Sequence, residues 1–238
     1  MKTIDNMLYL VLLANSDASI KVALFRGFVP LTQRIKTECR MSAHLTQAFE
    51  DVLKIGGVAL ADLDFIAVSQ GPGLFSHLRA ALAICNGIAM VHRIPLVGID
   101  YLKAWCDIMA LKYEKAENNS LLATIYNAYN NEFHYRIEMA RGDGRTVLAG
   151  PAYTDKHSLE KLLECFRSSA SLCLLAGDAC RLLSNQVNLS PLEICELSPE
   201  KELLCMAHWA LAQWNDQQTP VYELQPLYLK DTQFKKSE

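Results

Sequence analysis

The sequence lacks an excess of charge of one sign and lacks apolar segments long enough to cross a membrane. Of 238 residues, 23 are Lys or Arg and 26 are Asp or Glu, so the formal net charge is -3. We therefore expect no basic field over the whole surface, although a local basic patch stays open. The apolar run at residues 7–13 is too short to span a membrane. It predicts a buried strand, with a weak signal sequence as the alternative.

Several motifs of enzymes are also missing. The chain has no H-E-x-x-H, no G-x-S-x-G and no G-x-x-x-x-G-K-[ST], which argues against a zinc protease, a serine hydrolase and a P-loop nucleotidase. Its eight cysteines form no C-x-x-C pair, so we expect structural thiols in a reducing compartment, the cytoplasm. His44 lies in a helical pattern, but Ala48 and Arg40 stand one turn away, so a metal site there is not favoured.

The first half of the chain alternates strands and helices. We expect strands near residues 7–13, 19–25 and 31–40, with a turn at Asn15–Asp17, and a helix capped by Ser42 that ends at Gly56 and Gly57. A strand at 64–70, a helix at 76–91, a strand at 94–99 and a helix at 101–113 follow.

The second half repeats this order. After the polar stretch 114–120 we expect strands near 121–129, 130–140 and 146–153, a helix at 157–168 and a strand at 172–179. A long helix begins at Pro199 and an extended tail follows. The prediction is an α/β protein of two related mixed-sheet domains, 1–113 and 114–198, with the helix and tail of 199–238 packing back on the first domain.

The stretch Gly71-Pro72-Gly73 joins a predicted strand to a predicted helix and has two interpretations. Glycines at such a junction let the backbone approach a phosphate, which the helix N-terminus then binds. Alternatively, the glycines only supply the backbone angles of a tight turn that proline stiffens. Gly177 and Asp178 pose the same choice at the end of a later strand, where the plainer interpretation is a turn in which Asp178 caps the next helix.

Six stretches, in order, resemble the TsaB (YeaZ) family. "GPGLFSHLRAALAICNGIA" with "RIPLVGID" resembles the family signature "GPGSFTGLRIGLATAKGLA" with "IPLVGVSSL". The other five are "LVLLANSDASIKVALF", "MSAHLTQAFEDVL", "YNAYNNEFHYRIE", "LLAGDAC" and "LQPLYLKD". The resemblance implies two related domains of the actin/Hsp70-like ATPase (ribonuclease H-like) architecture.

The resemblance also implies a role in threonylcarbamoyl-adenosine modification of tRNA, although older descriptions called these proteins M22-type glycoproteases. TsaB-like proteins pair with the catalytic homologue TsaD, and an ATPase, TsaE, joins the complex. Without a cofactor of its own, such a scaffold would meet ATP or ADP only at the interface with its partner, near Gly71, Pro72, Gly73, Gly177 and Asp178. It would meet tRNA only through the complex, and would form a homodimer in isolation.

The family pairs through its first long helix and its small-residue helix. The resemblance therefore predicts partner contacts at His44, Leu45, Ala48, Phe49, Leu78, Ala81, Leu82 and Cys85. A charged replacement at Ala81 or Leu82 should abolish pairing, or unfold the monomer.

The sequence departs from the family at positions that bear on catalysis. The family's Asp-Thr at the end of the first strand falls on Ala14 and Asn15, and a methyl group cannot bind Mg²⁺. Leu74, Ser76 and His77 replace Ser, Thr and Gly in the signature loop. We therefore expect a non-catalytic scaffold. Two alternatives stay open: an autonomous ATPase or M22-type peptidase, and a homodimer with a function unrelated to tRNA.

Overall fold

The computed structural model describes residues 2–14, 19–37, 41–112, 119–128, 130–142, 144–184, 188–216 and 219–229. The expected turn at Asn15–Asp17 and most of the expected junction at 114–120 lie outside these residues. The chain divides into two compact units, which we describe separately. The first comprises Met1–Ile108 and Glu196–Pro226, and the second comprises Met109–Cys195 and Leu227–Glu238.

The first unit is built on a five-stranded mixed sheet in the order β3-β2-β1-β4-β5. Strands β1, β2 and β3 are antiparallel neighbours, whereas β4 and β5 run parallel to β1. Its elements are η1 (Ile4–Asn6), β1 (Leu8–Ala14), β2 (Ile20–Arg26), β3 (Val29–Lys36), α1 (Met41–Gly56), η2 (Leu60–Asp62), β4 (Phe65–Gly71), α2 (Phe75–His92), β5 (Leu96–Asp100), α3 (Tyr101–Lys112), which begins here, and α6 (Pro199–Asp216).

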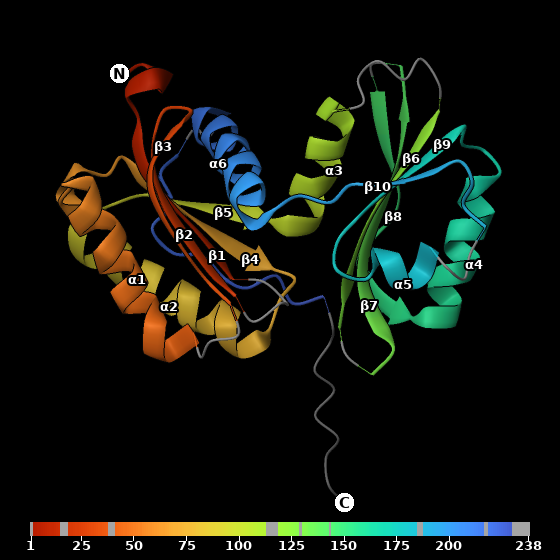
Figure 1. Ribbon diagram of the computed structural model, residues 1–238, viewed down its shortest axis with the longest axis horizontal. Helices are drawn as coiled ribbons and strands as arrows, with labels where there is room; N and C mark the ends of the chain where they lie inside the picture. Colours follow the sequence, from red (N-terminus) through yellow and green to blue (C-terminus); the bar gives the residue numbers. More distant parts are fainter. Residues whose placement is uncertain are drawn as a thin grey trace, which may run out of the picture. The chain divides into compact units, whose positions relative to one another are not determined.

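Helices cover both faces of this sheet (Figure 1). Leu8, Leu10 and Leu12 of β1 point to one face, where they form a core with the inner sides of α1 and α2. Tyr9 points to the other face, where its hydroxyl lies 3.0 Å from the carbonyl oxygen of Gly27 and 3.3 Å from that of Ala207 on α6. Both faces of β1 are buried, which explains why the strand is apolar throughout.

An aromatic stack fastens α6 to its face of the sheet. The ring of Tyr9 stacks on Phe65 of β4 with centroids 4.6 Å apart, and Phe65 stacks on Trp214 of α6 at 4.9 Å. Rings of this size bury large apolar areas, so the stack adds to the packing of the buried α6 residues, among them Leu203, Met206 and Leu211, against the sheet.

The second unit repeats the topology of the first. Its sheet has the order β10-β9-β6-β7-β8, in which β6, β7 and β8 are antiparallel neighbours and β9 and β10 run parallel to β6. The described elements are β6 (Ser120–Asn127), β7 (Glu132–Arg141), β8 (Gly144–Asp155), α4 (Lys156–Arg167), β9 (Leu172–Ala176), α5 (Cys180–Ser184) and β10 (Leu192–Ile194). The shared topology confirms the expected pair of related α/β domains.

Three details differ from the sequence-based expectation. Helix α1 begins at Met41, so Ser42 lies inside the helix and is not its N-cap. The expected strand at 172–179 ends at Ala176, because Gly177 turns the chain, and a short helix, α5, starts at Cys180. The three-residue strand β10 was not expected, since so short a segment carries no clear period.

Candidate functional site

The carboxyl ends of three parallel strands meet at one edge of the first unit's sheet. Strand β1 ends at Ala14, β4 at Gly71 and β5 at Asp100. This edge is where open α/β sheets bind their ligands. The hydroxyl of Ser69 joins two of the strands there, since its Oγ accepts a hydrogen bond from Ala14 N (2.8 Å) and lies 3.4 Å from Ala14 O.

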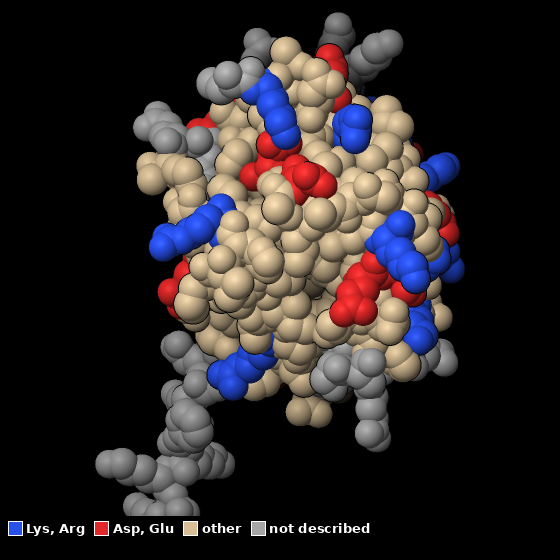
Figure 2. All heavy atoms as spheres, turned by 90° about the vertical axis from the view of Figure 1, so that its left-hand side faces the viewer, with Lys and Arg blue, Asp and Glu red and all other residues tan. Residues whose placement is uncertain are grey.

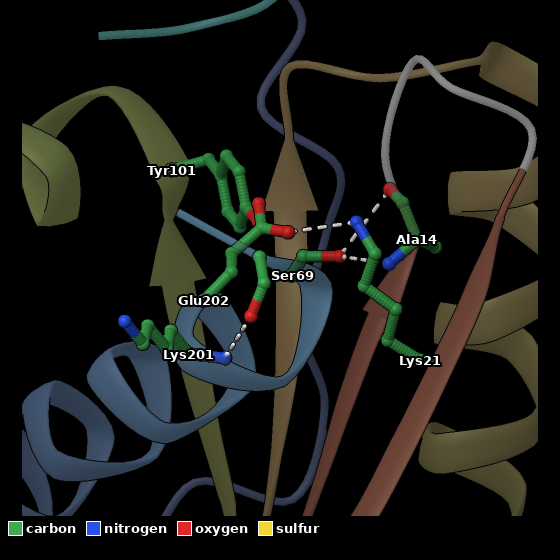
Figure 3. A network of polar contacts seen from close by, with 7 residues as sticks. Ala14, Lys21, Ser69, Tyr101, Lys201 and Glu202 are labelled. Carbon is green, nitrogen blue, oxygen red and sulfur yellow. Dashed lines mark hydrogen bonds and ion pairs between the residues drawn. The ribbon is translucent and has the colours of Figure 1, made fainter. Parts of the chain in front are cut away.

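A buried ion pair lies at this edge (Figure 3). Nζ of Lys21, from β2, is 2.7 Å from Oε2 of Glu202, from the first turn of α6. The hydroxyl of Tyr101 donates to the other carboxylate oxygen of Glu202. Lys21 is 3% exposed, Glu202 9% and Tyr101 0%. Both oxygens of the carboxylate are therefore hydrogen-bonded, as a buried charge requires.

The arrangement determines what this edge offers to a ligand. A phosphate or a hydrated metal ion would need accessible donors or carboxylates here. Ala14 supplies a methyl group, and the ammonium of Lys21 already has the Glu202 carboxylate beside it. The half-buried carboxylate of Asp100, at the end of β5, accepts a hydrogen bond from Lys103 N (3.1 Å). In the part of the chain that the structure describes, no three His, Cys, Asp or Glu side chains are placed to hold one metal ion.

Sequence reasoning missed this cluster, although a signal was available. Lys21 alternates with apolar residues and shares a strand face with Ala23 and Phe25, both buried. Glu202 precedes Met206 and Trp209 at helical spacing, on the apolar side of α6. One cation and one anion, each placed among apolar positions, indicate a buried pair.

The Gly71-Pro72-Gly73 loop forms the turn from β4 into α2. Gly71 is buried and has φ of 123°, a conformation that favours glycine, and Pro72 is buried too. Helix α2 begins at Phe75 without a side-chain cap from Leu74. These backbone requirements explain the motif as a turn; whether a nucleotide contacts it stays a prediction.

Gly177 and Asp178 belong to the second unit, where they fasten the end of β9 to β6. Gly177 has φ of 117°, and a Cβ placed there would lie 2.0 Å from the carbonyl oxygen of Ile125. The carboxylate of Asp178 accepts a hydrogen bond from Asn127 N at 2.7 Å. Asp178 thus holds the end of strand β6, a contact that the expected helix-capping role did not include.

The residues expected to contact a partner lie mostly in the core. His44 is half-buried, with Nδ1 3.0 Å from Nζ of Lys36. The other seven pack against the sheet of the first unit and are at most 8% exposed: Leu45, Ala48, Phe49, Leu78, Ala81, Leu82 and Cys85. Since these side chains already fill the interior, the surface of α1 and α2 that remains available to a partner consists of other residues.

The outer surface of α2 carries exposed apolar side chains. Phe75 is 51% exposed, Met90 72% and Val91 75%. Between these ends of the helix, the small residues Ala83 and Gly87 are exposed. They line a hollow of about 530 Å³ together with Asn86, Ala89, Met90, Arg93, Tyr222 and Glu223. We call Phe75, Ala83, Gly87, Met90 and Val91 the outer α2 surface.

The tail after α6 is held beside this surface. The side-chain amide of Asn86 donates to Leu224 O (2.9 Å) and accepts from Leu224 N (3.0 Å). Leu96 N of the edge strand β5 donates to Val221 O at 2.7 Å, and Gln70 Nε2 to Gln225 O at 2.7 Å. The Leu96–Val221 bond uses the edge of strand β5, and the bonds together place Tyr222 and Glu223 beside the hollow.

The charged side chains of one face and the thiol of Cys85 were compared with what a second site would need. Figure 2 shows small groups in which acidic and basic side chains lie close together, and wide neutral areas separate these groups. No extended basic area appears among the described residues of that face. Burial raises the pKa of the Cys85 thiol to about 12, so this thiol stays protonated at neutral pH. Among the described segments, no helix combines the length and apolar character needed to cross a membrane.

The topology of the two sheets defines a protein of the actin/Hsp70-like ATPase architecture. A crystal structure from Pseudomonas aeruginosa, of an uncharacterized protein with similarity to peptidase YeaZ, covers 94% of this chain and 100% of its own (TM-score 0.68, 21% identity). YeaZ of the same species covers 91% and 99% (TM-score 0.60, 20% identity). An inorganic polyphosphate/ATP-glucomannokinase from Arthrobacter is more distant, at 87% and 100% (TM-score 0.53, 11% identity). These likenesses establish the fold.

The sequence identifies the family. A family model described as "TsaD: tRNA N6-adenosine threonylcarbamoyltransferase" matches residues 11–159, more than half of the chain, and the chain belongs to this family. Together with the YeaZ-like fold, this match confirms the resemblance seen in the sequence.

The chain spans about a third of the length of the curated relatives it matches. The tRNA N6-adenosine threonylcarbamoyltransferase of Streptococcus agalactiae serotype V is 31% identical over 113 residues, which are 46% of this chain and 33% of that protein. The protein of the same name from Bacillus thuringiensis strain Al Hakam is 31% identical over 134 residues, 54% and 37% respectively.

Proposed function

We propose that this protein is a non-catalytic subunit that pairs with a TsaD-like catalytic subunit and activates threonylcarbamoyl transfer to the adenosine beside the tRNA anticodon. Membership of the TsaD family and the YeaZ-like fold support a role in this modification. The chemistry of the strand edge supports the non-catalytic part, because Ala14 ends β1 and the Lys21–Glu202 pair fills the neighbouring space. The catalytic carboxylates and donors would then belong to the partner.

The outer α2 surface is the observation on which the pairing proposal rests. Met90 and Val91, consecutive on α2, are 72% and 75% exposed, and apolar side chains gathered on one surface mark an interaction site. Exposed Ala83 and Gly87 between the helix ends let a second helix approach closely. A surface with larger apolar side chains at both ends of the helix and small residues between them fits a helix of the partner packed along α2.

The remaining features of the proposal are those that the resemblance to the TsaB (YeaZ) family implies. The subunit binds no cofactor of its own, and ATP or ADP is held at the joint with the partner. A TsaE-like ATPase joins the pair, tRNA is contacted through the assembled complex, and a homodimer through the same surface forms when the partner is absent. The seven cysteines that the structure describes are all free thiols, which suits the cytoplasm.

Reconstitution of the modification reaction tests this function. Threonylcarbamoyl transfer to tRNA would be measured with the TsaD-like and TsaE-like proteins of the same organism, with and without this chain. We expect transfer to require this chain, and we expect no ATP turnover by the chain alone. Turnover by the isolated chain would favour an autonomous enzyme, and transfer that proceeds equally well without it would contradict an activating role.

A further inference from the structure

Lys21 contacts Glu202 as a binding site contacts an anionic ligand. Here the ligand, the Glu202 carboxylate, belongs to the same chain. The two residues are 181 positions apart, and their side chains are 4% and 11% exposed. The ammonium comes from the sheet, whereas the carboxylate is delivered by the first turn of α6. A buried ammonium needs an anionic or strongly accepting neighbour, because desolvation of an unpaired charge is costly. Glu202 supplies that neighbour.

The surroundings of the carboxylate resemble those of a bound small anion. One oxygen of Glu202 meets the Lys21 ammonium at 2.7 Å, and the other accepts from the Tyr101 hydroxyl. The group lies at the carboxyl ends of parallel strands, the edge where this kind of sheet places anionic ligands. Figure 3 shows the ammonium, the phenol hydroxyl and the carboxylate converging from β2, α3 and α6.

We propose that Glu202 is a built-in anionic ligand, and that Lys21 and Tyr101 form a latent site for a small oxyanion, such as acetate or inorganic phosphate, which Glu202 keeps occupied. In the native protein this contact closes the edge of the sheet to free anions. Removal of the carboxylate opens the site, and an anion from solution takes its place. The proposal concerns the interior of the first unit and does not depend on pairing.

Chemical rescue of Glu202→Ala in the full chain tests the proposal. Thermal unfolding would be followed by circular dichroism at pH 7 in sodium acetate, sodium phosphate and sodium chloride of equal ionic strength. We expect acetate and phosphate to raise the Tm of Glu202→Ala by at least about 3 °C more than they raise that of the native protein, since a ligand bound only by the folded state stabilises it. The matched control is the double variant Lys21→Met/Glu202→Leu, which has neither charge and should behave like the native protein.

Two outcomes would overturn the proposal. Equal Tm changes in all three proteins would show a general effect of the salts on folding. Failure of Glu202→Ala to fold in any of the salts, while the double variant folds, would show that no anion replaces the carboxylate.

Phosphate binding measured directly gives an independent readout. Broadening of the inorganic phosphate signal in ³¹P NMR should appear with folded Glu202→Ala and be absent with the native protein and the double variant. Equal broadening with all three proteins would mean that phosphate binds elsewhere, and would also contradict the proposal. Failure of pairing with a TsaD-like subunit would leave these results unchanged, so the two proposals fail separately.

Discussion

Nζ of Lys21 and Oε2 of Glu202 lie 2.7 Å apart in the interior of the first unit, joining the second strand of the sheet to the C-terminal helix. The removal of one partner leaves the other charged and buried. We expect Lys21→Met and Glu202→Leu each to lower the free energy of unfolding by about 3–5 kcal/mol. The double variant should recover most of this loss, because two apolar side chains replace the pair. Urea unfolding of the three variants gives the coupling energy, and additive losses would contradict a direct pair.

The positions of Ala81 and Ala83 on α2 separate core packing from surface pairing. Ala81 is fully buried and Ala83 is exposed. We expect Ala81→Arg to unfold the first unit, since an arginine cannot enter a packed core. Ala83→Arg should keep the native circular dichroism spectrum and a Tm within about 2 °C. Ala61→Arg is the matched control for Ala83→Arg, because Ala61 is an exposed alanine of η2 that lies outside the outer α2 surface. A folded Ala81→Arg protein would mean that α2 packs differently.

Asn86 fixes the tail through two hydrogen bonds to Leu224. Asn86→Ala removes both, and we expect the amide of Leu224 to exchange with deuterium about 10-fold faster or more. Asn86→Asp keeps the oxygen that accepts from Leu224 N but loses the donor to Leu224 O, and should give an intermediate rate. Unchanged exchange in Asn86→Ala would show that the tail is held by Leu96 and Gln70 alone.

Gly177 is required by a close approach of the backbone. Gly177→Ala would place a Cβ 2.0 Å from the carbonyl oxygen of Ile125, at φ of 117°. We expect the free energy of unfolding of the second unit to fall by at least about 2 kcal/mol. Gly142→Ala is the control, because Gly142 also has positive φ (52°) but nothing lies within 4 Å of its Cβ position. Equal losses in both would attribute the effect to backbone conformation alone.

The thiols should differ in reactivity with their burial. Cys85 is fully buried with its pKa raised to about 12, whereas Cys165 is exposed. We expect iodoacetamide to label Cys85 at least about 100-fold more slowly than Cys165 in the native protein, by mass spectrometry of peptides. Because burial raises the pKa of folded Cys85, its contribution to stability is fully present below the unfolded value of 9.0 and is lost as the pH rises through about 12. Rapid labelling of native Cys85 would contradict its burial.

The sequence predicted the two related α/β units because their strands and helices have strong periods. The apolar run at β1 predicts a buried strand, and the apolar stripe of α1 predicts a helix with one side in the core. The outward side of α2 could not be identified from the pattern, since small and apolar residues occur all around that helix. Packing against the sheet buries Ala81 and Cys85 and leaves Ala83 and Gly87 exposed to solvent.

The sequence marks Lys21 and Glu202 as charged residues at apolar positions, but it does not show that the two contact each other. Lys21 and Glu202 are brought together only when α6 packs across the sheet, a long-range contact that no local period encodes. Similarly, the requirement for Gly177 depends on the carbonyl of Ile125 from a neighbouring strand. Sites of this kind become visible only once the strand order is known.

Pairing through the outer α2 surface is most directly tested by sedimentation. The native protein and Ala83→Arg would each be titrated against the TsaD-like subunit of the same organism by analytical ultracentrifugation, with and without ATP. We expect the native protein to form a heterodimer at the expense of its homodimer, and folded Ala83→Arg to lose at least about 10-fold in affinity. A native protein that stays self-associated and binds no partner at about 50 μM, weaker than most specific complexes, would contradict the proposed function. Undiminished binding by Ala83→Arg would contradict the surface.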